Sequence, residues 1–184
     1  LTKGGANTVL TSDGTDISWA AAGGGKILQV VQQNVTTNFS QAQTSGAGNW
    51  TTLNNFSQAI TPTASNSTIL VMVNISCVSG SNNGIAFKSI RGGSTDIQDP
   101  ADSSNRKGAN ARTMKNSDNN HNFATVNWSV LDSPATTDAT TYTIQFLCES
   151  NGTVYINRTV SLTDTAEAYG AITNSTMWLL EIGA

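Results

Sequence analysis

Apolar and polar side chains alternate along several stretches of the chain, which is the pattern of a β-strand with one buried face. The clearest case is residues 141–149, where one face is apolar at Tyr142, Ile144, Phe146 and Cys148. Asn151-Gly152 separates this run from a second alternating run at 153–157. Because Asn-Gly suits both positive-φ positions of a type I′ turn, the pattern predicts a β-hairpin. Residues 128–160 are therefore predicted to supply three neighbouring strands of one antiparallel sheet.

Three further stretches, residues 26–32, 67–80 and 175–182, carry apolar side chains on both faces. A strand with two apolar faces lies in the middle of a sheet or is covered by a partner chain. The first and last of these stretches open and close the globular region. We therefore expect them to be neighbours in one sheet. Additional strands are predicted at 84–93 and, as a short strand, within 50–62.

The segments between these strands are polar. Residues 34–49 are predicted to form a loop, residues 94–122 the longest surface excursion, and residues 161–173 a polar connection. Thr (26), Ser (20), Asn (20) and Gly (16) dominate the polar share, and Thr favours strands whereas the other three favour turns. With eight to ten expected strands and no segment of helical period, the sequence predicts an all-β fold, an antiparallel β-sandwich with jelly-roll topology.

The first 25 residues differ in composition from the rest of the chain. They contain six glycines and three consecutive alanines and lack sustained apolar periodicity. We therefore predict an extended, fibre-like stalk at 1–25 ahead of one β-sandwich head domain at 26–184. Asp13-Gly14 is a turn signal, and Trp19 is too large an apolar surface to remain bare, so we expect it to dock. We expect neither membrane insertion nor an export signal.

Charge and motif content argue against several functions. Charged residues make up 11% and the formal net charge is −3, so the chain lacks the basic surface that binds nucleic acid. His121 is the single histidine, and no nucleophile, metal-ligand or nucleotide motif accompanies it. We predict no enzyme activity, no metal and no cofactor. Cys77 and Cys148 lie within apolar strand patterns and are interpreted as buried thiols, with a disulfide as the alternative.

Several polar and aromatic side chains leave a binding role open. Three acids recur every third residue, at Asp96, Asp99 and Asp102; they could hold a cation, although solvated turn acids are the simpler interpretation. A sugar-stacking platform could be built from Trp50, Trp128, Trp178 and Tyr155, although packing explains aromatic residues in strands more simply. Asn-x-Ser/Thr occurs ten times, and we attribute this excess to strand and turn composition.

Four stretches in order, SNSTILVMV, VLDSPATTDATTYTIQF, VYINRT and TMWLLEIGA, carry a family resemblance. They resemble the C-terminal domain of many virion proteins of marine and freshwater bacteriophages and some algal viruses, in which "LDSP-ATT-x-x-x-TY", "INR" and a closing "EI" recur. The match covers about residues 26–184. The stalk stretch VLTSDGTDISWA resembles a module of tail-fibre proteins, with matching residues Leu10, Asp13, Gly14 and Trp19.

The resemblance implies a jelly roll similar to tumour-necrosis-factor and complement-type heads, assembled as a homotrimer at a fibre or spike tip on the virion exterior. It implies a role in virion structure or host attachment, with other virion proteins and a host-surface glycan or protein as further partners. The candidate subunit interface comprises Ile27, Val31, Trp178 and Leu180. The candidate receptor-contact loop comprises Arg91, Asp96, Arg106, Lys107, Arg112 and His121. A capsid decoration or cementing protein and a stand-alone carbohydrate-binding module are the alternatives.

Overall fold

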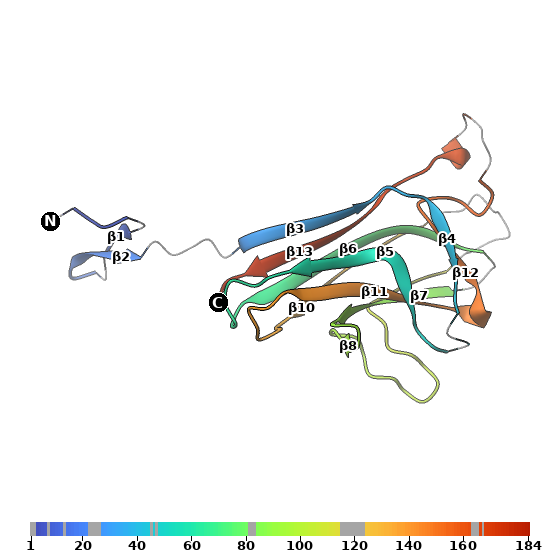
Figure 1. Cartoon of the computed structure of the whole chain (residues 1–184), viewed down its shortest axis with the longest axis horizontal. Helices are drawn as coiled ribbons and strands as arrows, with labels where there is room; N and C mark the ends of the chain where they lie inside the picture. The colour runs from blue at the N-terminus through green and yellow to red at the C-terminus, as the bar shows by residue number, and fades with distance from the viewer. Residues whose placement is uncertain are drawn as a thin grey trace.

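The computed structural model describes residues 3–6, 8–12, 14–21, 27–44, 46, 48–80, 84–114, 124–162, 166 and 168–184. The described residues form thirteen β-strands and two 3-10 turns, Glu149–Asn151 and Ala168–Gly170, and contain no α-helix (Figure 1). None of the helical turns in this part of the chain has the length and hydropathy of a membrane span. The predicted all-β class and antiparallel sandwich are confirmed.

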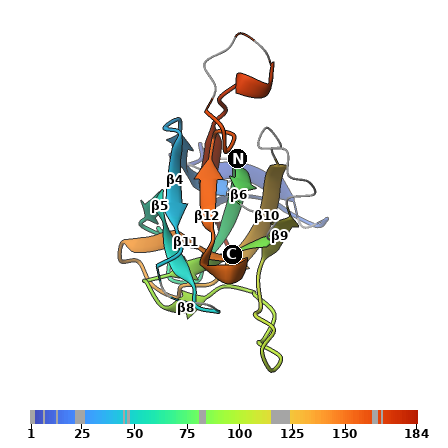
Figure 2. The same ribbon diagram turned by 90° about the vertical axis from the view of Figure 1, so that its right-hand side faces the viewer.

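Two antiparallel sheets face each other. The first sheet contains β3 (Ile27–Val35), β4 (Phe39–Ala42), β6 (Thr68–Ser79), β10 (Ala124–Asp132), β12 (Thr153–Ile156) and β13 (Ser175–Ile182). The second sheet contains β5 (Thr51–Ile60), β7 (Gly84–Arg91), β8 (Thr95–Asp96), β9 (Ala111–Met114) and β11 (Thr140–Cys148). In the first sheet β12 lies between β4 and β6 (Figure 2).

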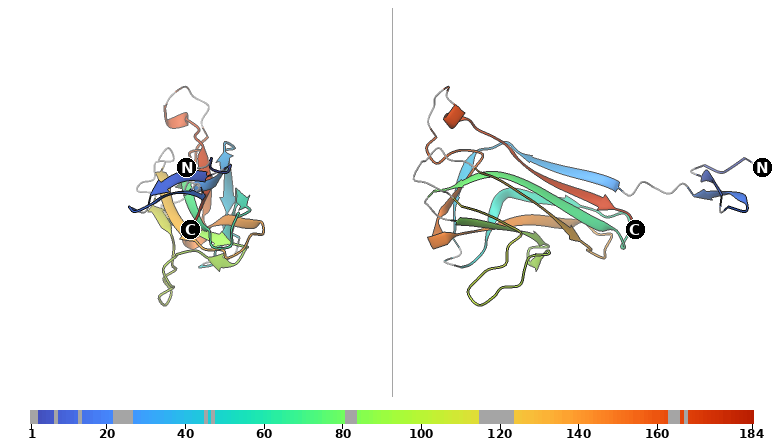
Figure 3. Two further views of the ribbon diagram at one scale, coloured as in Figure 1. Left: turned by 90° about the vertical axis from the view of Figure 1, so that its left-hand side faces the viewer. Right: turned by 180° about the vertical axis from the view of Figure 1, so that it is seen from behind.

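The strand order is that of a jelly roll. We set aside the short strands β4, β8 and β12 and number the other described head strands 1 to 8 in chain order, from β3 to β13. The first sheet, β3-β13-β6-β10, then has the order 1-8-3-6. The second sheet, β5-β11-β7-β9, has the order 2-7-4-5. Each connection except the one from β7 to β9 crosses from one sheet to the other. The first and last head strands, β3 and β13, pair side by side as the sequence predicted (Figure 3).

The core lies between the sheets and consists of side chains from alternate strand positions. On β11 the predicted inward set is at most 2% exposed: Tyr142, Ile144, Phe146 and Cys148. On β6, which the sequence showed to be apolar on both faces, the inward side chains are at most 3% exposed: Ile69, Val71, Val73, Ile75 and Cys77. These faces pack with Phe56 and Phe87 into one cluster. The alternation in the sequence therefore predicted the inward face of β11 correctly, because this strand buries one side only.

A buried polar network ties three strands of the first sheet together around Asn157. Its side-chain amide donates to the Val35 and Thr37 carbonyls, and its side-chain oxygen accepts from the Ser175 hydroxyl. That hydroxyl accepts from the Ser76 backbone N–H. Asn157 also takes φ +59°, a left-handed conformation that asparagine tolerates better than most residues. The INR stretch is thus structural, and the fully buried Asn157 is unsuited to carry a glycan.

Glutamine side chains close the open side of the sandwich, where β3 and β4 face the edge strand β5. Three of them, which we name the glutamine seam, are Gln29, Gln33 and Gln41. Their partners are backbone groups: Thr61 C=O for Gln29, Ser57 N–H for Gln33, and Asn54 N–H with Thr52 C=O for Gln41. These hydrogen bonds satisfy some of the backbone groups along the edge of β5, which would otherwise be open to pairing with another chain.

The predicted hairpin between residues 141–149 and 153–157 is wrong. β11 pairs with β5 and β7 in the second sheet, whereas β12 pairs with β4 and β6 in the first. Asn151 has φ +54° but Gly152 has φ −68°, so the type I′ turn does not form. Gln43 holds this crossing between the sheets instead. Its side-chain oxygen accepts a hydrogen bond from the Cys148 N–H, and its backbone N–H donates to the Gly152 carbonyl. Strand β10 also lies in the first sheet, so residues 128–160 do not form three adjacent strands.

Two predicted loops contain strands. Residues 34–49 include β4, whose Phe39 packs on the core, and residues 94–122 include β8 and β9, both paired with β7. Within the second segment Ile97 is 2% exposed, and the Asn110 side chain accepts from the Ser89 N–H and donates to the Ile97 carbonyl. Polar side chains hold these strands, so the apolar pattern did not predict them.

Strand β5 is longer than the predicted short strand. It runs for ten residues, with Asn55 at φ +64° and a register shift between Thr143 and Gln145 of its partner β11. At this irregularity the four residues 53–56 lie opposite the single residue Ile144, three more than in a regular ladder, so Leu53 and Phe56 both point into the core although three positions separate them. The loose apolar spacing is therefore the signature of a bulged strand.

The predicted stalk is not extended throughout its described residues. Strands β1 (Thr8–Ser12) and β2 (Ile17–Ala21) pair as an antiparallel hairpin. Gly14 has φ +94° in the turn between them, which confirms the predicted turn, although Asp13 lies outside the described residues. Trp19 lies against Gly4 so closely that a Cβ there would be 2.5 Å from the ring. The domain boundary at residue 25 stays a prediction.

Candidate functional site

The outward face of the first sheet is apolar over four strands. Registered positions form one row, Val30, Leu180, Leu70 and Leu131, and a second row, Gln32, Trp178, Met72 and Ser129. Leu28 extends this surface, which we name the apolar face, with exposed fractions of 41% at Leu28, 50% at Val30, 42% at Met72 and 44% at Leu131. Large apolar side chains thus meet solvent as a continuous patch rather than singly.

Charged groups are excluded from this face. Within β3, β6, β10 and β13 the only charged residues are Asp132 and Glu181. Glu181 is fully buried, and Asp132 bonds to the inward-facing Arg91 and Tyr142. The next outward row, Asn34, Thr176, Asn74 and Asn127, is polar and uncharged. Water-exposed sheet faces usually carry charges, so the apolar face has the composition of a contact surface.

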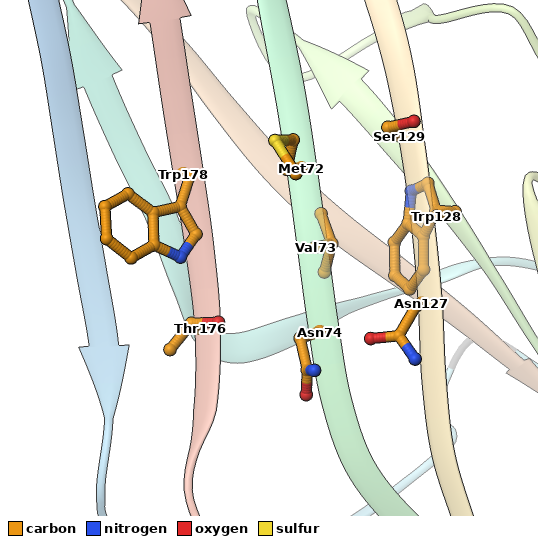
Figure 4. A pocket seen from close by; sticks show the side chains of 8 residues that line it. All are labelled: Met72, Val73, Asn74, Asn127, Trp128, Ser129, Thr176 and Trp178. Atoms are coloured by element: carbon orange, nitrogen blue, oxygen red, sulfur yellow. The ribbon is translucent and has the colours of Figure 1, made fainter.

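A groove of about 400 Å³ runs along β6 between β10 and β13. Met72 and Asn74 line its middle, with Trp178 on β13 and Asn127 on β10 (Figure 4). Figure 4 shows the Trp178 and Met72 side chains on neighbouring strands. The groove is a recess in which an apolar side chain of a partner can be seated between aromatic and thioether surfaces.

The structure separates the four predicted interface residues. Trp178 and Leu180 are half-buried on the apolar face, and Ile27 is 56% exposed at the strand's start. Val31 points inward and packs on the core, so it does not share a surface with Trp178. β3 is an edge strand, which excludes the central position considered for it. Leu28, Val30 and Met72 were not singled out, although apolar side chains on both sides of their strands carried the signal.

Glu181 is a buried carboxylate beneath the apolar face. Burial opposes its ionisation, but hydrogen bonds from the Gln29 amide and from the Thr63 hydroxyl and N–H, each 2.7 Å, hold its pKa at about 2. The ionised carboxylate therefore connects β13 to β3 and to the β5–β6 connection. Its contacts give it a structural role.

The outward face of the second sheet is polar. One registered row is Thr52, Gln145 and Lys88. Lys88 is only 7% exposed because the Asp96 carboxylate lies 2.6 Å from its ammonium and the Trp50 ring 4.8 Å away. The next row is Leu147, Ala86 and Arg112. Together with the neighbouring loop residues Asp102, Arg106 and Lys107, these side chains place charge on this side of the molecule.

A second groove, which we name the arginine groove, lies between this sheet and the 105–107 loop. Its volume is about 540 Å³, and its lining includes Arg106, Lys107, Arg112, Leu147 and Glu149. Lys107 pairs with Asp102 at 2.6 Å, and the Gly108 N–H donates to the same carboxylate. The hydrogen bond from Lys107, followed by that from Gly108, lowers the pKa of Asp102. This folded loop positions Arg106 at the groove.

The structure brings together only some of the predicted receptor-contact residues. Arg106, Lys107 and Arg112 line one groove, whereas Asp96 is bound to Lys88. Arg91 faces inward and pairs with Asp132 through two 2.8 Å hydrogen bonds, so it links the two sheets. His121 lies outside the described residues. The sequence analysis did not predict the groove floor, which is formed by the small residues Gly84 and Ala86. The one signal in the sequence was Leu147, an apolar residue on the otherwise polar face of residues 141–149.

Asp132 also accepts a 2.7 Å hydrogen bond from the Tyr142 hydroxyl. Burial, and then this hydrogen bond, raises the pKa of Tyr142 well above its usual value. Arg91, Asp132 and Tyr142 together close the side of the sandwich between β10 and β7. This arrangement is a buried, satisfied polar cluster that joins β7, β10 and β11.

The other candidate sites are not assembled. Within the described residues no three His, Cys, Asp or Glu side chains group as a metal site, and Asp96 and Asp102 each bind a lysine. The aromatic residues lie apart. Trp128 stacks on Phe87 with ring centroids 5.8 Å apart and donates to the Ser89 hydroxyl, whereas Trp178 faces outward from the first sheet. No shared stacking platform therefore exists among these residues.

Both cysteines are buried free thiols. Burial raises the pKa of Cys77 and of Cys148 to about 12, and Cys148 adds to the effect at Cys77. Such protonated thiols are poor nucleophiles and poor metal ligands. Their place in the structure is that of small apolar core side chains.

No family model and no curated protein matches the sequence. Two solved structures that resemble the chain are those of the infectious bursal disease virus Gx strain and of the infectious bursal disease virus VP2 subviral particle. The TM-score is 0.35 for both, with 11% and 12% identity over 94% and 96% of this chain. The chain spans 42% of the length of each. At that TM-score the likeness supports no conclusion about function.

Proposed function

We propose that this chain is a non-enzymatic structural protein of a virion, a jelly-roll head that self-associates as a homotrimer through the apolar face. In this proposal the head sits at the tip of a fibre or spike on the virion exterior and contacts a host surface through loops of the second sheet. The ordered family motifs and the jelly-roll strand order support the virion role.

The apolar face is the observation that carries the proposal. Four of its side chains are 41% to 50% exposed, and burying the remaining surface of each would stabilise an assembly by about 1 kcal/mol. The face carries no charge that would require a complementary charge on a partner, so a second copy of the same surface is a suitable occupant. Because a sheet face is broad and flat, several copies can pack around a common axis.

Mass photometry of the purified chain at micromolar concentration tests self-association. We expect a trimer for the wild type and a monomer for Met72→Glu, because the new carboxylate would be desolvated at the centre of the interface. Gln145→Glu adds the same charge to the outward face of the second sheet and should leave the trimer intact. Circular dichroism establishes that both variants are folded. A stable wild-type monomer would contradict the proposal.

Location in the virion distinguishes the fibre head from a capsid decoration or cementing protein. Cryo-EM of the particle should place this chain at the end of a fibre or spike, and density in a capsid lattice would support the cementing alternative instead. The carbohydrate-binding module alternative requires an exposed aromatic platform. Trp128 and Trp178 face different sides of the first sheet, so these two rings form no such platform.

A further inference from the structure

The arginine groove has a floor made of small and apolar groups. Ala86 on β7 lies in register between Leu147 on β11 and Arg112 on β9. A Cβ at Gly84 would lie 3.0 Å from one terminal nitrogen of Arg112 and 3.2 Å from its Nε. The guanidinium therefore lies flat over the backbone of β7. Glycine at position 84 leaves the space that this orientation needs.

The groove concentrates positive charge on a chain whose net charge is −3. Lys107 is neutralised by Asp102. Within the described part of the chain Arg106 and Arg112 make no ion pair, so two guanidinium groups remain available to a ligand. The carboxylate of Glu149 lines the same groove, which disfavours a second anionic group directly beside the one on the arginines, as in a polyphosphate.

We infer that the arginine groove binds an acidic saccharide, with an anionic group on Arg106 and Arg112 and a sugar ring over Leu147 and Ala86. A planar guanidinium matches a carboxylate or sulfate through paired hydrogen bonds. Leu147 and Ala86 offer an apolar floor for the C–H face of the ring, and the Asn105 amide, which also lines the groove, can bond a hydroxyl. A volume of about 540 Å³ is in the range of small-ligand sites.

This inference rests on the proposed function only for the source of the saccharide, a host surface. Binding itself needs one folded head and no assembly, because the groove lies on the outward side of the second sheet. Mass photometry of the same sample reports the oligomeric state independently. A monomer that binds the saccharide would contradict the trimer and leave this inference standing, and a trimer that does not bind would do the reverse.

Isothermal titration calorimetry with four probes tests the inference. The probes are tetragalacturonate, its methyl-esterified form, a sulfated galactose tetramer and inorganic sulfate. We expect at least one acidic oligosaccharide to bind at least tenfold more tightly than the esterified form and than sulfate alone. The carboxylate and sulfate arms identify the anionic group. Absence of binding by both acidic oligosaccharides at millimolar concentration would overturn the inference.

Variants locate the site. Arg112→Gln and Arg106→Gln should each weaken binding about tenfold, whereas Arg158→Gln, which removes an arginine that lies over Tyr155, should not change it. Gly84→Ala keeps the net charge but displaces the Arg112 guanidinium, so it should weaken binding by several-fold. Unchanged binding in both groove arginine variants, or an equal loss in Arg158→Gln, would show that the anion does not use this groove.

Discussion

The outward faces of the two sheets differ although the same core lies behind both. On the first sheet one row across four strands reads Val30, Leu180, Leu70 and Leu131. On the second sheet the corresponding side chains read Thr52, Gln145 and Lys88. Inward packing needs only one face of each strand, so it does not determine what the other face carries. Among the described residues of the larger strands, charged side chains point outward only on the second sheet, as at Lys88 and Arg112.

Charge is excluded from the outside of the first sheet but not from its inside. Glu181 on β13 and Asp132 on β10 both have hydrogen-bonded partners in the interior or at its margin. The first sheet therefore tolerates carboxylates where donors satisfy them. In our proposal the absence of charge from the apolar face follows from desolvation by a second copy, since a charge buried there would find no donor. Substitutions inside the sandwich test the first effect, the stabilisation of buried carboxylates by hydrogen-bond donors, without changing the apolar face.

Glu181→Gln should have the largest effect on stability of the single substitutions that keep the apolar face intact. The neutral amide still accepts from Thr63 but presents an N–H to the Gln29 amide, so we expect a loss of about 2 kcal/mol. The wild type should also lose stability as the pH falls from about 4.5 to about 2, because the folded-state pKa of Glu181 is depressed to about 2. Urea denaturation between pH 7 and pH 2 measures both.

The matched control for this prediction is Asp138→Asn, which neutralises an exposed carboxylate outside the strands. It should leave the acid dependence of the free energy of unfolding as in the wild type, whereas Glu181→Gln should flatten it. An identical acid dependence in Glu181→Gln and the wild type would contradict the structural role of this carboxylate. Unchanged trimer formation in Glu181→Gln would sharpen the comparison, because the charge it removes lies inside the sheet.

Tyr142→Phe tests the cluster that joins the two sheets between β10 and β7. Removal of the hydroxyl deletes the 2.7 Å hydrogen bond to Asp132 and should cost about 1 kcal/mol. Because the pKa of Tyr142 is raised in the folded state, the wild type should lose stability above about pH 10, where the unfolded tyrosine ionises. The variant should lose less over that range.

Thermal denaturation from pH 8 to pH 11 measures this difference. Tyr155→Phe is the control, since it removes the same hydroxyl from half-buried Tyr155 beside Arg158, away from Asp132. If Tyr142→Phe and Tyr155→Phe follow the same alkaline curve, the hydroxyl of Tyr142 does not link the sheets as described.

Sequence patterns predicted the sheets' inward faces but not their connections. Alternation identified the buried side of β11 because burial of one face is a local property. The Asn151-Gly152 turn was misread because the crossing there depends on Gln43, more than a hundred positions away in sequence. No local pattern reports such a contact. The strands β4 and β9 were missed because polar contacts and pairing partners hold them.

The candidate surfaces were predicted in part for the same reason. Apolar residues on both sides of β3 and β13 pointed to a covered face, and the structure places Leu28 and Val30 on it. The pattern did not separate Val31, which faces inward. Arg106 and Arg112 were named as loop candidates, but their common groove depends on the pairing of β9 with β7. That pairing brings residues about 25 positions apart into one row, which composition cannot report.

Gln41→Met should have the smallest effect and tests the other side of the sandwich. It removes one acceptor and one donor that satisfy the Asn54 N–H and the Thr52 carbonyl. Water can replace both at this exposed position, so we expect a loss of only about 0.5 kcal/mol in urea denaturation. The freed edge of β5 should nevertheless pair more readily with other chains, which would appear as faster aggregation by light scattering. Gln145→Met, which adds the same apolar side chain to the outward face of β11, should not open that edge. Equal aggregation of the two variants would mean that the glutamine seam does not protect β5, and that only the apolar face governs association.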